Sequence, residues 1–594
     1  MKKIKSTVIA AILIVSLCVP VRAAGISIDV PVSEGNIDVS AVMSDRLNNY
    51  LEKADEDELI SVTIELTDNI DMEEVESLAV SRADISTAGM AIMNMDTSSF
   101  SEEVNEAHQE VMTELRDKIS AERNEILKEH YSDKNAAFIA SVGLSEEQCG
   151  SIGILTPFIR EVLLTPSQIQ KIACNPNVCY IDYVGGDEGR DLASVDDTYQ
   201  IINGNVSVES GYKGSGIRVG MIEAGFPKLS AMGSDSQNIV KIGSGTETEH
   251  ATKVSGIIKK MAPSCSIYSY AVSSTSDVAD DCSRLIYYYN VHVVNISYGG
   301  SSDGKYNAFS REIDSLVAAT GVPVVIASGN GTPATNYVNL FGVSPNAITV
   351  GAVTSAGKNQ GATGAYMLGS YSIYREPSGI INKPDICAPG KVKIYSYDES
   401  EGTSFAAAHV TGTVVQMMSR NSVLQGRAQT VKAAIMASAS YNAGTSMSYV
   451  TGTRASNQEG AGVIDAGFCY NVARYGRGMR YEASSGTESF TYTVVCDSAT
   501  KPFRIACAWE AISANSSTSI TDYDMRVYKN GTLVASSNAY ANSSSKPNSN
   551  YEIIELSTSI LSTYGAGSYQ VEIKRSGSYN GSGDIKIGLA WGQR

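Results

Sequence analysis

An apolar run that ends on a carboxylate, VGMIEAGFP at residues 219–227, decides the fold class of this chain. Val219 to Ile222 predict a buried strand, Glu223 ends it, and a glycine turn follows. Carboxylates are rare at the end of a buried strand unless they are paired, because desolvating the charge is costly. We therefore expect Glu223 to have a partner, and a histidine is the partner that would make it chemically useful.

Similar apolar strands alternate with helical stretches on the carboxyl-terminal side of this motif, through residues 217–470. Near-continuous apolar strands separated by helices predict a mostly parallel sheet with helices on both faces. In such α/β folds the active site lies at the carboxyl ends of the strands. The expected strands are IRVGMI, SIYSYAV, VHVVNISY, VPVVIAS and AITVGAV.

The pattern changes on both sides of this α/β segment. From about residue 476, short alternating strands and an Asn530-Gly531 hairpin signal predict an all-β sandwich. Towards the amino terminus, residues 25–55 look like a loose polar leader. The stretches that follow predict a strand at 60–68, a charged helix at about 105–131, a strand, Thr-capped helix and strand at 157–184, and a linker at 185–197.

Composition limits the classes of function. The 594 residues carry 46 basic and 64 acidic side chains, a net charge of −18, which argues against a nucleic-acid partner. The first residues, MKKIKSTVIAAILIVSLCVPVRAAG, predict a secretory signal peptide cleaved after Ala23. A membrane anchor is the alternative, but the apolar run is short for a span. We expect a secreted, extracellular protein of bacterial type with no membrane partner.

Nine cysteines remain after the signal peptide, and no CxxC pair or His-rich cluster accompanies them. A zinc site is therefore not expected. Cys496 and Cys507 flank a predicted strand–turn–strand and are the candidate disulfide pair. Buried free thiols are the alternative.

Four residues of the α/β segment carry side chains that can take part in catalysis, and each is expected at the end of a strand or the start of a helix. Glu223 ends a strand, His250 stands at the start of a helix, and Ser404 lies just inside another helix start among very small residues. Such a helix start supplies N–H groups for an anion. Asn330 follows an apolar strand and can donate a side-chain hydrogen bond. Taken singly, each has an ordinary structural explanation, such as a helix cap for the serine.

The other histidines compete poorly for a catalytic role. His292 lies inside a strand, where a buried, hydrogen-bonded role is expected, and His409 follows Ser404 by five positions on the same helix, which points it away. His108 and His130 belong to the charged amino-terminal helix and are expected at the solvated surface.

In their flanking sequence, the four residues resemble the subtilisin-like serine proteases, the subtilases, over roughly residues 200–470. The strand-Asp-turn motif of that family is similar to GSGIRVGMIEAG at 214–225, and its histidine motif to HATKVSG at 250–256. VNISYGG at 294–300 resembles the substrate-binding strand and ASGN at 327–330 the oxyanion segment. KPDICAPG at 383–390 and GTSFAAAHVTG at 402–412 resemble the stretch that contains the nucleophile.

This resemblance implies a division of labour. Ser404 would be the nucleophile, His250 the general base, and Glu223 the acid that orients the imidazole. Asn330 and the Ser404 N–H would form the oxyanion hole. Ser297, Tyr298 and Gly299 would pair with the backbone of a protein or peptide substrate. No cofactor is required for this chemistry and no metal site is assigned; the resemblance allows structural calcium, without an assigned ligand loop.

Several positions depart from the family pattern. Glu223 stands where the family has aspartate, and the extra methylene moves the carboxylate by about 1.5 Å unless the site adapts, although catalytic geometry tolerates misplacement of ~1 Å poorly. Ala251, Lys253 and Ala408 replace a glycine, a second histidine and a proline. A catalytically inactive secreted binding protein is therefore the alternative function. Related serine-carboxyl proteases use no catalytic histidine, and the placement of His250 disfavours that class.

The flanking regions complete the predicted architecture. Residues 56–184 resemble a subtilase propeptide, an intramolecular chaperone and inhibitor, and a permanent accessory domain is the alternative. We predict a signal peptide (1–23), an α+β propeptide (24–190, from about 56), a subtilisin-like α/β domain (191–475) and a C-terminal β-sandwich (476–594). The predicted function is that of a secreted serine endopeptidase made as a zymogen, with its own propeptide as inhibitor.

Overall fold

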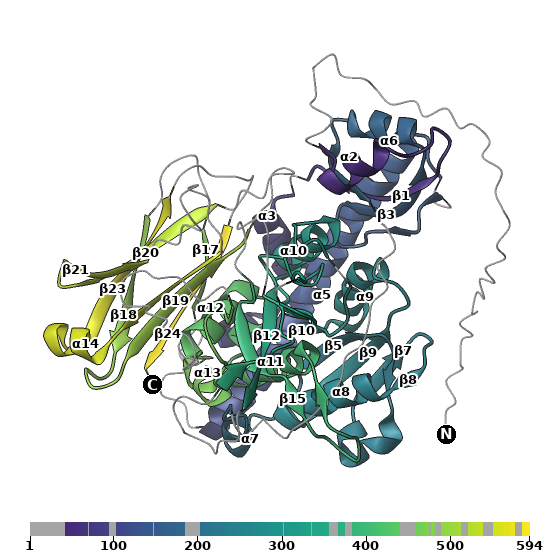
Figure 1. Ribbon diagram of the computed structural model, residues 1–594. Coiled ribbons are helices and arrows are strands. Elements are labelled where there is room, and N and C mark those ends of the chain that lie inside the picture. The colour runs from purple at the N-terminus through teal and green to yellow at the C-terminus, as the bar shows by residue number, and fades with distance from the viewer. Residues whose placement is uncertain are drawn as a thin grey trace, which may run out of the picture.

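The computed structural model has an amino-terminal α+β region, a central α/β region and a carboxyl-terminal all-β region (Figure 1). No helix within the described residues is both long and apolar enough to cross a bilayer. The predicted signal peptide at 1–23 and the predicted boundaries at 190/191 and 475/476 lie outside the described residues and stay predictions. The structure describes residues 42–68, 70–93, 102–145, 148–183, 202–300, 302–333, 335–355, 366–374, 383–439, 458–473, 477–481, 489–511, 521–537, 550–576 and 585–593.

The amino-terminal region is built on an antiparallel sheet in the order β2-β3-β1-β4. Thr165 caps α6 through a complete capping box with Gln168, which confirms the predicted strand, Thr-capped helix and strand. The elements are α2 (Asp45–Leu51), β1 (Ile60–Leu66), α3 (Met72–Arg82), α4 (Thr87–Met93), α5 (Glu102–Ser141), β2 (Ser151–Ile152), β3 (Phe158–Leu164), α6 (Pro166–Ala173) and β4 (Val178–Tyr183).

Part of the predicted polar leader is folded. Ser44 caps α2 by accepting a hydrogen bond from the Leu47 N–H, and Leu47 is fully buried against the four-stranded sheet. The prediction of a loose segment was wrong at these residues, because a helix of seven residues shows too little periodicity to be recognised from sequence.

The long helix α5 extends the predicted charged helix at both ends and lies along the central region (Figure 1). Its apolar side chains Ile119, Ile126 and Leu127 belong to the same buried cluster as helices of that region. Asp117 binds Arg218, at the start of a central strand, with an N–O distance of 2.7 Å. The amino-terminal region is therefore packed against the central region through the middle of this helix.

The central sheet has the order β13-β12-β11-β10-β5-β9-β7, with β14 paired to β12, and every described pair is parallel except β12 with β13. This confirms the predicted, mostly parallel sheet. The strands are β5 (Arg218–Glu223), β7 (Ile239–Ile242), β9 (Ser266–Ala271), β10 (Val293–Ile296), β11 (Val324–Ala327), β12 (Ile348–Ser355), β13 (Tyr366–Leu368) and β14 (Ile386–Pro389), with the short pairs β6 (Phe226–Pro227) with β8 (Glu247–Thr248) and β15 (Lys391–Val392) with β16 (Ser400–Glu401).

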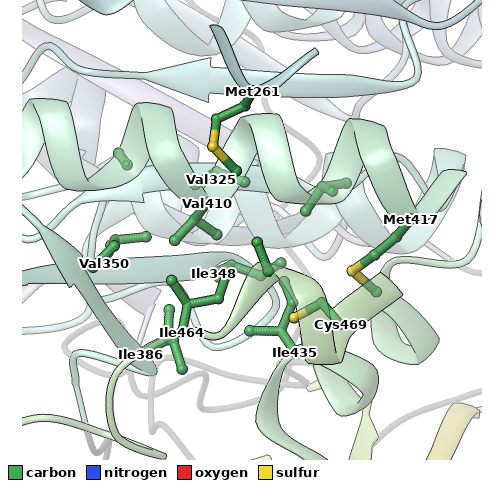
Figure 2. Close-up of a cluster of buried hydrophobic side chains, with 14 of the residues drawn as sticks. Met261, Val325, Ile348, Val350, Ile386, Val410, Met417, Ile435, Ile464 and Cys469 are labelled. Atoms are coloured by element: carbon green, nitrogen blue, oxygen red, sulfur yellow. The ribbon is translucent and has the colours of Figure 1, made fainter. Parts of the chain in front are cut away.

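Helices cover both faces of this sheet, because alternate residues of its buried strands point to opposite sides. Val219 and Met221 of β5 join one apolar cluster with α8 and α11, whereas Ile222 joins the other with α9 and α10. Figure 2 shows part of the first cluster, to which both Val410 and Ile348 belong. The helices are α7 (Asn205–Glu209), α8 (Glu249–Met261), α9 (Asp277–Tyr289), α10 (Ala308–Thr320), α11 (Thr403–Arg420), α12 (Ala428–Ser438) and α13 (Ala466–Ala473), with 3₁₀ turns η2 (Leu229–Ala231), η3 (Gly233–Ser236) and η4 (Ser422–Leu424).

The carboxyl-terminal region is a sandwich of two antiparallel sheets, β17-β24-β19-β22 and β18-β23-β20-β21, with a shared apolar core. Asn530 and Gly531 both have positive φ and join β20 to β21, which confirms the predicted hairpin. The elements are β17 (Arg477–Tyr481), β18 (Ser489–Cys496), β19 (Phe503–Trp509), β20 (Asp522–Lys529), β21 (Thr532–Ser537), β22 (Tyr551–Leu556), α14 (Thr558–Tyr564), β23 (Gly567–Ser576) and β24 (Ile585–Gln593).

The candidate disulfide is absent from the described residues. Cys496 lies on β18 and Cys507 on β19, strands of opposite sheets, and the two thiols are not bonded to each other. Both are buried, and burial raises the pKa of the Cys507 thiol well above its usual value. Cys496 and Cys507 are therefore buried free thiols, the alternative stated above.

Candidate active site

The three predicted catalytic residues come from three different elements of the central region. Glu223 is the last residue of β5, His250 is the second residue of α8, and Ser404 is the second residue of α11. All three are buried, with 1%, 7% and 5% of their surface exposed. Their elements meet at the carboxyl end of the parallel strands, the edge where the sequence places the site.

Glu223 pairs with His250. The Glu223 Oε2 and the His250 Nδ1 are 2.8 Å apart, the distance of a charge-assisted hydrogen bond. The Nδ1–H donates to the carboxylate, so the neutral imidazole carries its acceptor lone pair on Nε2. The extra methylene of glutamate therefore does not prevent the contact that the triad geometry requires.

Ser404 lies in the first turn of α11, where main-chain N–H groups have no acceptor within the helix. Gly402 precedes the helix in an extended conformation, and the Ser404 Oγ donates to the Ser297 carbonyl at 3.2 Å. The ring of the next residue, Phe405, lies with its centroid 5.3 Å from that of His250. The first turn of α11, which carries Ser404, is thus packed against the His250 ring through Phe405.

Asn330 follows β11 and is oriented by the start of α11. Its Oδ1 accepts hydrogen bonds from the Thr403 N–H at 2.8 Å and the Thr403 Oγ1 at 3.0 Å. A main-chain N–H can only donate, so the atom that faces Thr403 must be the amide oxygen. The Nδ2 donor is consequently directed away from the helix end.

The predicted substrate-binding residues follow β10 at the same edge. Ser297 exchanges hydrogen bonds with the nucleophile residue, since its Oγ donates to the Ser404 carbonyl at 3.0 Å while its own carbonyl accepts from Ser404. The Asn339 amide donates to the Tyr298 carbonyl at 3.4 Å. A Cβ at Gly299 would lie 2.1 Å from that same amide, so only glycine permits this close approach.

Two supporting residues were not identified from the sequence. Asn295 donates to the Ser297 Oγ at 2.9 Å and accepts from Thr411 of α11 at 2.9 Å, which fixes the nucleophile helix to β10. A polar residue inside the apolar run VHVVNISY was the available signal.

Lys253, noted only as a departure from the family pattern, has a buried role. Its ammonium group donates to the Asp398 carbonyl at 2.8 Å and to Ser400, and it pairs with Glu249. It therefore connects α8, which carries His250, to the segment that leads into the nucleophile turn.

The structure gives each remaining histidine a structural partner. His292 is buried, accepts from the Arg218 N–H at 3.0 Å and donates to Asp117 at 2.9 Å, and His409 donates to the Phe405 carbonyl, as predicted for residues outside the site. His108 and His130 are half-buried rather than solvated, because α5 packs against α4 and the β1–α3 connection. His108 lies 3.1 Å from the Ile92 carbonyl and His130 lies 3.4 Å from Asp68.

The resemblance allows structural calcium. Within the described ranges, no group of three or more His, Cys, Asp or Glu side chains is placed to hold a metal ion.

Comparison with known proteins gives a family match for most of the central region. Residues 230–462 match the model of the Subtilase family, a span that contains His250, Asn330 and Ser404, whereas Glu223 precedes it. No curated protein matches the chain. One solved structure, described as the MycP3 protease from the type VII (ESX-3) secretion system, is 17% identical, with 48% of this chain and 94% of that chain covered and a TM-score of 0.34.

Proposed function

We propose that this chain, in which residues 230–462 match the subtilase family of serine proteases, is a secreted serine endopeptidase. The observation that carries the proposal is the buried hydrogen bond between Glu223 and His250 beside the nucleophile helix. A buried carboxylate that orients an imidazole next to a helix-start serine is the arrangement that activates a hydroxyl group for acyl transfer.

The proposed reaction begins with a rotation of the Ser404 side chain. The hydroxyl leaves the Ser297 carbonyl and donates to the His250 Nε2, a tightening that catalytic hydrogen bonds commonly undergo when substrate binds. The Ser404 Oγ attacks the scissile carbonyl as His250 takes the proton, and Glu223 stabilises the imidazolium. His250 then protonates the leaving amine, and a water molecule hydrolyses the acyl-enzyme by the same steps.

The oxyanion of the tetrahedral intermediate is stabilised by the Asn330 Nδ2 and the Ser404 N–H. This role is supported by the Thr403 contacts, because they fix the asparagine oxygen and so direct the other end of the amide. A preorganised donor costs no reorganisation at the moment of reaction. The segment Ser297–Gly299 pairs with the backbone of the protein or peptide substrate by strand addition.

The amino-terminal region is proposed to be a propeptide that inhibits the enzyme until it is cut within 184–197. Its sheet is attached to the start of α10, where Asp182 accepts from the Ala308 N–H at 2.9 Å, and to Arg311 through Glu65 at 2.5 Å. Because α10 connects β10 to β11, it begins at the carboxyl edge of the sheet. The chain thus leaves β4 close to the edge that carries the site.

Intact mass tests the propeptide proposal. Wild-type protein should lose its amino-terminal residues up to a cut within 184–197 as activity appears, whereas Ser404→Ala should keep them. Active preparations that retain the full mass would favour a permanent accessory domain.

A fluorophosphonate probe tests the proposed activity, because it labels only an activated serine. Wild-type protein should be labelled at Ser404, and Ser404→Ala should not be labelled. Ser297→Ala is the matched control, since it removes a neighbouring hydroxyl that is not the proposed nucleophile and should leave labelling detectable. No labelling of wild type, even after removal of the amino-terminal region, would instead favour a catalytically inactive binding protein.

A further inference from the structure

A cavity of about 330 Å³ lies where the three regions of the chain meet. It is lined by α3, α4 and α5, by the segment between η4 and α12, and by β24. Its volume is at the lower end of the range of small-molecule sites, ~300–1,000 Å³. None of the candidate active-site residues lines it, so it is a separate feature of the molecule.

Positive charge predominates on the wall of this cavity. Arg116 and Arg123 reach it from α5, Arg427 from the residue before α12, and Lys586 from β24. Glu76 is the acidic side chain of the lining and lies 2.9 Å from the Arg123 guanidinium. Lys586 is paired with Glu510 at 3.2 Å. Within the described lining, three guanidinium groups therefore accompany the one carboxylate of Glu76.

Buried donors on this wall have no acceptor. The Arg116 Nε, the Arg123 Nε and the Gln429 Nε2 have no hydrogen-bond partner among the described residues. Only 7% of the Arg123 side chain is exposed. Native proteins leave few buried donors unsatisfied, and each such group calls for an explanation. Three of them around one cavity indicate a common missing acceptor.

The amino-terminal end of α12 also favours a negative charge in the cavity. The helix begins beside the cavity, with Gln429 and Thr430 in its first turn, and no side chain caps it. The positive end of a helix dipole favours an anion at this position. Burial, and next the charge of Arg427, lower the pKa of Arg116 to about 10, because both disfavour the positive charge of Arg116 itself.

We propose that the cavity binds a small anionic ligand, an oxyanion group on a short apolar body, through Arg116, Arg123 and Arg427. The planar guanidinium group presents paired N–H donors that match the oxygens of a phosphate or carboxylate. Val80, Met93, Ile119 and Ile587 supply the apolar part of the wall. An anion with an apolar body fits both surfaces, whereas water alone would leave the excess charge uncompensated.

The site joins parts of the chain that are distant in sequence. Two of the arginines belong to α5 of the amino-terminal region, and Arg427 belongs to the central region. The ligand therefore bridges the two regions and stabilises their contact. This proposal does not depend on the catalytic proposal, and the site should exist in protein that cannot cleave anything.

Binding is tested on full-length Ser404→Ala protein, which stays intact whatever its activity. Isothermal titration with hexyl phosphate should give one saturable event and should raise the Tm by about 2–4 °C at saturation. Inorganic phosphate tests the headgroup alone, hexanoate tests a carboxylate on the same body, and hexanol tests the body alone. Hexanol should not bind, and the ratio of the phosphate to the carboxylate affinity identifies the preferred headgroup. Absence of saturable binding by all three anions would overturn the proposal.

Substitutions test whether hexyl phosphate binds in the cavity. Arg116→Gln should weaken binding by about 10- to 100-fold, the loss expected for a charged hydrogen bond. Arg82→Gln is the matched control, because it removes the same charge from α3, where Arg82 pairs with Glu129 outside the cavity, and its affinity should be unchanged. Equal affinities of Arg116→Gln and wild type would contradict the assignment.

A second variant, Ser120→Asp, tests the proposal independently, so that the test remains valid if Arg116→Gln misfolds. Ser120→Asp places a carboxylate next to Arg123, whose guanidinium lies 3.0 Å from the Ser120 hydroxyl. This built-in anion should raise the Tm of the ligand-free protein and abolish the response to hexyl phosphate. A ligand-free Tm at or below that of the parent, with the ligand response intact, would also overturn the proposal.

Discussion

Glu223 and His250 are 27 positions apart in the chain and meet at the carboxyl edge of the central sheet, where the Glu223 Oε2 lies 2.8 Å from the His250 Nδ1. The carboxylate comes from the end of β5 and the imidazole from the first turn of α8, a helix whose Thr248 cap sets the orientation of that turn. Both groups are buried. The glutamate side chain therefore reaches the imidazole, because β5 and α8 bring the two residues together at this edge.

Glu223→Gln should lower kcat by about 10³-fold or more, because an amide cannot stabilise the imidazolium and can favour the wrong tautomer, as in serine proteases whose orienting carboxylate is neutralised. The check is the rate of fluorophosphonate labelling. Glu223→Asp is the informative partner, since its shorter side chain should also be slower at a site built for glutamate. Faster labelling of Glu223→Asp than of wild type would show that glutamate is a defect here.

Asn330→Leu should reduce kcat by about 10²–10³-fold with little change in KM, the size of loss measured when such an asparagine is removed from a subtilisin. Leucine keeps the side-chain volume but has no donor for the oxyanion. The measurement is steady-state cleavage of a peptide substrate. Thr403→Val, which removes one of the two contacts to the Asn330 Oδ1, should cause a smaller loss. A change confined to KM would contradict the oxyanion role.

Activity should rise between about pH 6 and 8, because His250 must be neutral to accept a proton and imidazole ordinarily titrates near ~6.5. The measurement is kcat/KM across that range at constant ionic strength. Circular dichroism at each pH provides the control for unfolding. A flat profile would argue against His250 as the general base.

Asp281→Asn should stabilise the protein more at pH 8.5 than at pH 4.5. Burial, and then the charges of Asp280 and Asp277, raise the pKa of Asp281 to about 8 from the ordinary 3.8. The folded state therefore holds a proton that the unfolded state has lost between these values, so stability falls as the pH rises through this window and the cost is complete above pH 8. Thermal unfolding of the variant and wild type at both pH values measures the difference.

Asp280→Asn is the control for Asp281→Asn, and it should change stability in the opposite direction. Asp280 binds the Arg284 Nε at 2.7 Å and lies 3.5 Å from Arg160, so neutralising it weakens the ion pair with Arg284 and leaves the buried Arg160 with Glu312 as its remaining carboxylate partner. It should lower the Tm at neutral pH. Stabilisation by both substitutions would mean that the cluster as a whole is destabilising.

Gly588→Ala should destabilise the fold by about 1–3 kcal/mol, as overpacking does in close-packed interiors. A Cβ at Gly588 of β24 would lie 2.3 Å from the Thr430 nitrogen of α12, a main-chain atom that cannot rotate away. Chemical denaturation measures the loss. Leu533→Ala on β21, a side chain that is 50% exposed, is the control and should change stability little. A free energy of unfolding of Gly588→Ala equal to that of wild type would show that β24 of the sandwich is packed only loosely against α12.

The sequence was informative wherever a local pattern reports the environment of a residue. The strand at 218–223, the capping box at Thr165 and the Asn530-Gly531 hairpin depend on near neighbours, so periodicity and turn chemistry predicted them. The candidate triad came from the resemblance of the flanking motifs to the subtilases, because each residue taken singly at a strand end or a helix start has an ordinary structural explanation. The short helix α2 and the half-buried state of His108 and His130 were missed, since both depend on what packs against them.

By itself, therefore, the sequence determined the α/β class of the central region and the sandwich, and its resemblance to the subtilases supplied the candidates for the active site. Only the tertiary structure decided that Glu223 reaches His250, that Thr403 orients Asn330, and that arginines of α5 face Arg427 across a cavity. The physical reason is that hydrogen bonding, desolvation and like-charge proximity act over distances of a few ångströms in space. Separation along the chain does not report those distances, so contacts between distant residues appear only once the chain is folded.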